Sequence, residues 1–201
     1  MSTIEDTIAA IATPHGRGGI AIVRVSGPQA LTVAKILTNI TPETRQAYFK
    51  QFKLNNEVID EGVLLYFASP NSYTGEDVIE LQGHGGNIAP QRVLNAVLSI
   101  DGVRQAEPGE FTKRAFLNNK MDLTAAEAVE DLISAGSQSA AKAALASLEG
   151  AFSDNLNSLS EQITNFRVRL EACLDFPEEH EDFFESGKTD IALNDIEQLA
   201  S

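Results

Sequence analysis

The chain has 201 residues, of which 43% are hydrophobic, and its 15 Lys and Arg against 29 Asp and Glu give a formal charge of −14. These values are typical of one large or two small folded domains and exclude a wholly disordered chain. The single cysteine, Cys173, cannot form an internal disulfide, no signal-peptide pattern opens the sequence, and no apolar run approaches the roughly 18 residues of a membrane span. We therefore expect a cytoplasmic protein without a membrane segment.

The charge is unevenly distributed along the chain. Residues 1–120 carry 11 basic and 12 acidic side chains, whereas residues 121–201 carry 4 and 17. Because acidic surfaces repel phosphate backbones, we do not expect this chain to bind RNA by itself. The three histidines and Cys173 lie too far apart for metal-ligand spacing, so no metal site is expected.

Residues 1–120 alternate between strand and helix signals. β-Branched and aromatic runs bounded by turn residues predict strands over residues 7–12, 20–26, 48–54, 58–67 and 78–82. Apolar spacings of three and four predict short helices over residues 30–37 and 88–98. The break Asn55-Asn56 favours a hairpin between the third and fourth strands. This part of the chain is therefore expected to be an α/β domain.

From about residue 122 the pattern becomes helical. Thr124 and Glu127 match a capping box, which predicts that a helix begins there. Apolar residues from Leu145 to Cys173 recur every three or four positions, which predicts one long helix with a narrow apolar seam. The fold class is thus α+β, an α/β domain followed by helices.

Pro177 is expected to end the long helix, before an acidic loop over residues 178–189. Another helix is expected to begin near Ile191. The sequence ends before its apolar pattern is complete, which is what a piece of a longer protein would show. Gly187-Lys188-Thr189 resembles the end of a phosphate-binding loop, but Asp182 stands where that motif requires glycine, so we do not interpret it as a nucleotide site.

Two charged side chains interrupt apolar strands. Arg24 lies within residues 20–26 and Glu80 within residues 78–82, each between apolar neighbours. A charge in such a strand needs a partner. In the structural interpretation, each residue is an ion with its charge satisfied, and the two residues could be each other's partner. The functional interpretation is a polar anchor in an apolar pocket, where a carboxylate accepts two parallel hydrogen bonds from a heterocycle with an amino group beside a ring N–H.

Other features carry weaker signals. The loop Gly16-Arg17-Gly18-Gly19 could bind an anion, but a plain tight turn is the favoured interpretation. His84, within Gly83-His84-Gly85-Gly86, could act as a general base or bond to the backbone, and we favour the latter because no serine or cysteine lies nearby in sequence. Cys173 is interpreted as a small core residue.

Several long motifs in this order resemble the MnmE (TrmE) family of tRNA-modification GTPases. They occupy residues 6–14, 16–19, 22–28, 72–86, 108–124, 126–128 and 174–179. The resemblance implies a folate-binding-type α/β domain over residues 1–119, similar to that of the glycine-cleavage aminomethyltransferase, through which family members form homodimers. Residues 120–201 would then be the first part of an all-helical domain, truncated before the GTPase domain inserted into it. Part of its apolar seam would be exposed unless a partner covers it.

The resemblance also implies a function for the full-length protein. With the flavoprotein MnmG (GidA), family members use a one-carbon tetrahydrofolate to modify the wobble uridine, U34, of certain tRNAs, while potassium-stimulated GTP hydrolysis times the cycle. We expect 5-formyl- or 5,10-methylene-tetrahydrofolate on this chain, and GTP, Mg²⁺ and K⁺ in the full-length protein only. The chain alone is expected to lack GTPase activity and to meet tRNA through the complex.

The family motifs map the folate site onto Arg24, Glu80 and Lys120. Glu80 is assigned to the amino edge of the pterin, and the two cations to negative or carbonyl groups of the ligand. No catalytic residue and no metal ligand is expected in this chain. His15 and Glu107 depart from residues common in the family, which affects the expected loop conformation more than folate binding.

Two other functions remain open. The chain could be a non-enzymatic scaffold that recruits MnmG through its helical half, a possibility that folate affinity would test. A self-contained aminomethyltransferase is disfavoured, because only about 120 residues form the α/β part and no complete catalytic constellation is visible.

Overall fold

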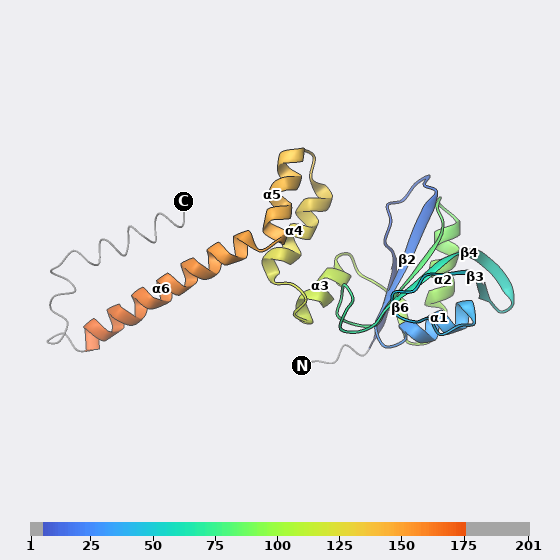
Figure 1. Ribbon diagram of the computed structural model, residues 1–201, viewed down its shortest axis with the longest axis horizontal. Coiled ribbons are helices and arrows are strands. Elements are labelled where there is room, and N and C mark those ends of the chain that lie inside the picture. Colours follow the sequence, from blue (N-terminus) through green and yellow to red (C-terminus); the bar gives the residue numbers. More distant parts are fainter. Residues whose placement is uncertain (1–5, 176–201) are drawn as a thin grey trace. The chain divides into compact units, whose positions relative to one another are not determined.

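The computed structural model describes residues 6–175, and the chain divides into two units, Met1–Met121 and Asp122–Ser201 (Figure 1). The first unit contains a mixed sheet with helices, and the described part of the second is helical. Among residues 6–175, no helix combines the length and the apolar character that crossing a membrane requires.

The expected strands and helices of the first unit are confirmed, with ends shifted by one or two residues. The strands are β1 (Thr7–Ile11), β2 (Ile20–Ser26), β3 (Tyr48–Leu54), β4 (Glu57–Phe67), β5 (Val78–His84) and β6 (Val103–Gln105). The helices are α1 (Ala30–Thr38), α2 (Ala89–Leu98) and α3 (Glu110–Leu117). Strand β6 and helix α3 were not expected, because a three-residue strand and an eight-residue helix carry too short a periodicity.

The six strands form one sheet in the order β3-β4-β5-β2-β1-β6. All neighbouring pairs are antiparallel except β1 and β6, which run parallel. The β3–β4 hairpin turns at Asn55 and Asn56, whose φ angles of 51° and 67° are the left-handed values that a type I′ turn requires. The Asn-Asn signal in the sequence therefore identified this turn correctly.

The hydrophobic core lies between one face of the sheet and helices α1 and α2. Val23 and Val25 of β2 and Ile79 and Leu81 of β5 are at most 1% exposed within it. Because alternate residues of a strand point to opposite faces, Arg24 and Glu80 lie on the other face. The loop of residues 70–77 contacts this second face near the end of β2 through a hydrogen bond between Ser26 and Thr74, and helix α3 contacts it through the Phe111 ring near Arg24.

The second unit begins with α4 (Leu123–Ser134), α5 (Gln138–Leu148) and α6 (Ala151–Asp175). The predicted helix start near Thr124 is confirmed, but the capping box is wrong, because Asp122 is the N-cap and its carboxylate accepts the Ala125 amide at 2.7 Å. The prediction of one long helix from Leu145 onward is also wrong. Gly150, with a φ of 96°, separates α5 from α6, and such a left-handed residue stops an α-helix.

Three side chains of the apolar seam keep nearly half of their surface exposed. Leu145, Leu156 and Ile163 keep 45%, 43% and 48% of their surface. The expectation that this seam is partly uncovered is therefore confirmed within residues 6–175. The side chain of Cys173, the helix end at Pro177, the acidic loop, the last helix and Gly187-Lys188-Thr189 lie outside what the structure describes.

Candidate functional site

Arg24 and Glu80 form an ion pair on the second face of the sheet. They lie directly opposite each other in the β2–β5 pair. The Nε and Nη2 atoms of Arg24 donate to Oε1 of Glu80 at 3.0 and 2.8 Å. Their side chains are 28% and 12% exposed. The structural interpretation, that the two charges satisfy each other, is confirmed, and both side chains keep part of their surface exposed.

Two aromatic rings lie near the guanidinium of Arg24. The Arg24 guanidinium carbon lies 5.5 Å from the ring centroid of Tyr73 and 5.8 Å from that of Phe111, within the range of cation–π attraction. On the other side, Nε2 of Gln82 donates to Oε2 of Glu80 at 3.2 Å. The carboxylate thus has one fully occupied oxygen and one with a single long hydrogen bond.

Lys120 is connected to this pair through the loop of residues 70–77. Its Nζ donates to the Pro70 carbonyl at 3.0 Å, and neighbouring Asn118 donates to the Thr74 carbonyl at 2.7 Å. The same loop carries Tyr73. The structure therefore brings Arg24 and Glu80 into direct contact, and it places Lys120 against the loop that contacts Arg24.

A buried arginine anchors α3 and this loop to the sheet. The side chain of Arg114 in α3 is 3% exposed. It donates to the backbone carbonyl and Oδ1 of Asp6, at 2.9 and 2.6 Å, and to both oxygens of Glu76, at 3.2 and 3.1 Å. Ser26 of β2 also donates to Glu76, at 2.6 Å. These bonds fix the two segments that carry Phe111 and Tyr73.

A second arginine, Arg104, extends the network at its rim. It donates to Oδ2 of Asp6 at 2.6 Å and to both oxygens of Glu110 at 2.9 and 2.5 Å. The hydrogen bond from Arg104 lowers the pKa of Glu110 to about 2. Partial burial raises the pKa of Asp6, but bonds from Arg104 and the charge of Arg114 outweigh it, so the net pKa is lowered. Both carboxylates are therefore ionised over the physiological pH range.

His84, at the end of β5, is held by Asp60 of β4. The Asp60 carboxylate accepts the His84 backbone amide at 2.9 Å, and its other oxygen lies 2.6 Å from His84 Nδ1. The favoured interpretation, that His84 bonds to the backbone, is wrong, because its ring contacts the side-chain carboxylate of Asp60. The hydrogen bond with Asp60, helped by that carboxylate's charge, raises the pKa of His84.

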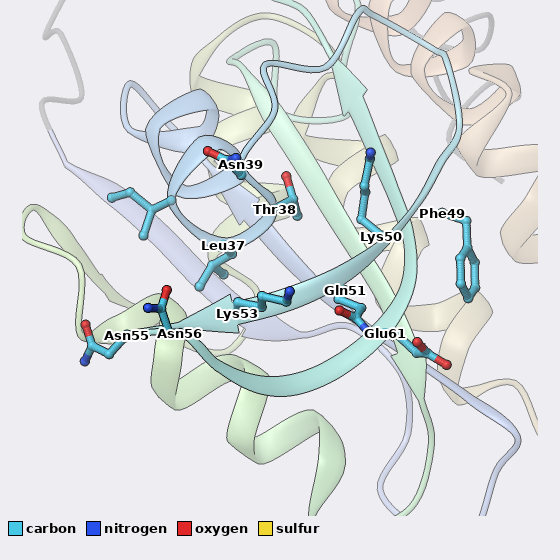
Figure 2. A pocket seen from close by; sticks show the side chains of 11 residues that line it. Leu37, Thr38, Asn39, Phe49, Lys50, Gln51, Lys53, Asn55, Asn56 and Glu61 are labelled. Atoms are coloured by element: carbon cyan, nitrogen blue, oxygen red, sulfur yellow. The ribbon is translucent and has the colours of Figure 1, made fainter.

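Within residues 6–175, cavities lie beside the sheet, and two of them are relevant here. One, of about 260 Å³, adjoins the second face and is lined by Gly19, Ile20, Phe49, Glu61, Gly62, Val63, Gln82, Gly83 and His84. The other, of about 850 Å³, lies where the end of α1 meets β3 and the β3–β4 turn, and Figure 2 shows its polar lining, which includes Lys50, Lys53, Asn55 and Asn56. The larger cavity contains none of the expected site residues, so we place the candidate site on the second face.

Several residues of this site were missed in the sequence. Gln82 could have been found, since it follows Glu80 by two and so shares its face of the strand. The contacts of Tyr73, Phe111 and Arg114 depend on how a loop and a short helix pack, which no local pattern reports. Within residues 6–175, no cluster of three His, Cys, Asp or Glu side chains could hold a metal ion.

Comparison with known proteins assigns both parts of the chain. A family model described as "GTP-binding protein TrmE N-terminus" matches residues 7–120, and one described as "MnmE helical domain" matches residues 123–201. Relatives named tRNA modification GTPase MnmE are 53% identical over 192 residues in Shewanella woodyi, 52% over 193 in Saccharophagus degradans and 50% over 192 in Proteus mirabilis. The alignments cover 95–96% of this chain but 42% of each relative.

Proposed function

Because the chain belongs to the MnmE family of tRNA modification GTPases, we propose that it supplies that family's folate-binding and dimerisation functions. Residues 1–119 are assigned to an aminomethyltransferase-like folate-binding domain and residues 120–201 to the first part of the helical domain. The full-length protein would act with MnmG in the cytoplasm to build the aminomethyl-type modification on U34 of certain tRNAs. The Arg24–Glu80 pair, with the rings of Tyr73 and Phe111 near its guanidinium, is the observation that carries this assignment.

The donor set fits a reduced folate. The pterin presents an amino group beside a ring N–H, and a carboxylate can accept both. A carboxylate has about four acceptor positions, of which Arg24 and Gln82 occupy three around Glu80. The pterin edge would take the remaining position on Oε2 and displace the 3.2 Å bond from Gln82. Arg24 would stay paired and keep Glu80 ionised and oriented.

The other parts of the site complete this arrangement. Tyr73 and Phe111 offer ring surfaces beside the pair against which a planar pterin can stack. Lys120 has two ammonium hydrogens beyond the one given to Pro70, and these are assigned to carbonyl or negative groups of the ligand. Bound 5-formyl- or 5,10-methylene-tetrahydrofolate would supply the one-carbon unit, and the residues named here would bind and orient it. None of them is assigned a catalytic step.

Partners and the GTPase cycle belong to the same proposal. The chain spans about 42% of its relatives' length, and GTP, Mg²⁺ and K⁺ are assigned to the full-length protein. Homodimerisation is assigned to the N-terminal unit, where Ile20 and Phe49 keep 68% and 69% of their surface. Contact with tRNA is assigned to the complex with MnmG, because residues 121–201 carry 17 acidic against 4 basic side chains.

A scaffold function is the second candidate. The half-exposed apolar residues Leu145, Leu156 and Ile163 on α5 and α6 are the observation that favours it, since such residues need a covering partner. Under this alternative the helical half recruits MnmG and the α/β unit is only structural. Folate affinity separates the two candidates.

The test is a calorimetric titration of this chain with 5-formyltetrahydrofolate. Saturable binding is expected, and Glu80→Ala should weaken it at least about tenfold through loss of a charge-assisted bond. Glu57→Ala is the matched control, because Glu57 also pairs with an arginine, Arg92, but is 74% exposed and lies outside the site. Circular dichroism checks that each variant is folded. A folded parent that does not bind, or a Glu80→Ala variant that binds like Glu57→Ala, would contradict the assignment.

A further inference from the structure

The larger cavity, of about 850 Å³, follows the free edge of β3. In the sheet order of the described residues, β3 is an outermost strand, with β4 on one side only. Because alternate residues of a strand point to opposite faces, Lys50 shares a face with the buried Phe52, and Lys53 lies on the other face. Both lysines line the cavity, so it passes around the free edge (Figure 2). At about 3.3 Å per residue, the two positions are about 10 Å apart.

Lys50 and Lys53 have no counterion in the part of the chain that the structure describes. Four arginines of this unit are held in the ion pairs described above. Neither lysine forms an ion pair or a side-chain hydrogen bond with any residue between 6 and 175. Glu61 lines the same cavity but pairs with neither of them. The two ammonium groups are therefore available to an anion from outside the chain.

Exposed amide side chains lie in the same lining. Gln51 lies between the two lysines on β3, and Asn39 follows the end of α1. Asn55 and Asn56 form the β3–β4 turn. All four are exposed, and their side chains make no hydrogen bond within the described residues. A side-chain amide both donates and accepts, so these groups can bond to phosphate oxygens and to hydroxyl groups.

This lining suits a chain of phosphates better than another strand or an enclosed small molecule. Lysines on a free strand edge oppose the addition of a further strand. Most of the lining residues are exposed, so the cavity is a groove in which an extended ligand can lie. Lysines neutralise phosphates, and the amides can bond to the 2′-hydroxyl groups that distinguish RNA from DNA.

We propose that this groove binds the phosphate backbone of an RNA strand through Lys50 and Lys53, assisted by the amides of Gln51, Asn55 and Asn56. The inference rests on the proposed function, because the tRNA that the full-length protein modifies with MnmG supplies the RNA. Two phosphate contacts are few against the chain's formal charge of −14, so the groove acts within that complex.

Two other lining residues do not assist the RNA. The Glu61 carboxylate repels phosphate and leaves the charged side chains of the groove with a formal sum of one positive charge. Phe49 is left to the homodimer contact proposed above. The expected contribution is therefore that of two lysine–phosphate contacts, without stacking of a base on an aromatic ring.

The experiment measures binding of a labelled tRNA with unmodified U34 to the complex of the full-length protein and MnmG. Fluorescence anisotropy is recorded at several salt concentrations, because each phosphate contact adds about 0.7–0.9 to the slope of log affinity against log salt. The double variant Lys50→Gln/Lys53→Gln should weaken binding at least about tenfold at 0.1 M salt and reduce the slope by about 1.5.

Two matched double variants show whether the position and the charge matter. Lys113→Gln/Lys142→Gln removes two exposed lysines that lie outside the groove and should bind tRNA like the parent. Lys50→Arg/Lys53→Arg keeps both charges in the groove and should retain the salt slope of the parent. Circular dichroism of the 201-residue chain with each pair of changes checks that it is folded.

The outcomes separate this inference from the proposed function. If the parent complex does not bind tRNA, the function in tRNA modification fails, and the groove fails with it. If the parent complex binds tRNA and Lys50→Gln/Lys53→Gln keeps its affinity and salt slope, the groove is wrong while the function stands. The inference is also overturned if Lys113→Gln/Lys142→Gln weakens binding as much, since overall charge would then be the cause. Equal losses in the glutamine and arginine variants of the groove would overturn it as well, because the effect would then come from the fold.

Discussion

Replacement of Arg114 by methionine should strongly destabilise the N-terminal unit. The arginine side chain is 3% exposed and neutralises Glu76, which is 14% exposed, so the variant would leave a nearly buried carboxylate without its cation. Breaking a buried ion pair by removal of one partner costs about 3–5 kcal/mol. Asp6, the other partner, is 44% exposed and can be rehydrated, so we expect the lower end of that range, about 3 kcal/mol.

Urea unfolding followed by tyrosine fluorescence measures this loss selectively. The chain has no tryptophan, and its three tyrosines, Tyr48, Tyr66 and Tyr73, all lie in the N-terminal unit. With a slope of about 1–3 kcal/mol per M, a loss of about 3 kcal/mol lowers the urea midpoint by about 1–3 M. The matched control is Arg92→Met, which breaks an exposed pair with Glu57 and should cost less than about 0.5 kcal/mol.

A double variant tests the cause of the effect. If the uncompensated charge of Glu76 is responsible, addition of Glu76→Gln to Arg114→Met should recover about 1 kcal/mol or more. A loss of stability in Arg114→Met no larger than that in Arg92→Met would show that the buried pair does not stabilise the unit. A double variant as unstable as the sum of its single changes would show that the charge of Glu76 is not the cause.

Three further changes test other parts of the structure. The pKa of Glu110 in the folded state is lowered to about 2, so its contribution to stability is complete above about pH 4.5 and is lost as the pH falls towards 2. In Glu110→Gln, the urea midpoint should therefore decrease less between pH 4.5 and pH 2 than it does in the parent. Gly62→Ala would drive a Cβ into the Gln82 carbonyl oxygen and should cost about 1–3 kcal/mol by the same unfolding assay, whereas Gly19→Ala, which meets nothing within 4 Å, should cost less. Asp122→Ala removes the N-cap of α4 and should cost about 1 kcal/mol of stability. The loss should be seen as a lower midpoint temperature when unfolding is followed by the helical circular dichroism signal.

Local patterns predicted the elements that have a long or distinctive signal. The β-branched run of β2 and the Asn55-Asn56 turn were found because alternation and left-handed turn residues act over few positions. The break at Gly150 was missed because Leu145, Leu148 and the residues after it keep helical spacing across it, so periodicity alone cannot register one left-handed residue.

The candidate site shows the same division. Arg24 and Glu80 could be found because a charge in an apolar strand is conspicuous, and their pairing follows from the register of β2 and β5. Arg114 is more deeply buried than either, yet it follows the polar residues Thr112 and Lys113 in a short helix, and this local pattern gives no sign of its burial. Its contacts with Asp6, 108 residues away, exist only in the folded unit.

The most direct test of the account is a crystal structure of this chain with bound 5-formyltetrahydrofolate. We expect the pterin amino edge on Oε2 of Glu80 and its ring beside Tyr73 and Phe111. Density for the ligand in the polar cavity beside β3 (Figure 2), with the Arg24–Glu80 pair uncovered, would contradict the assignment of the folate site.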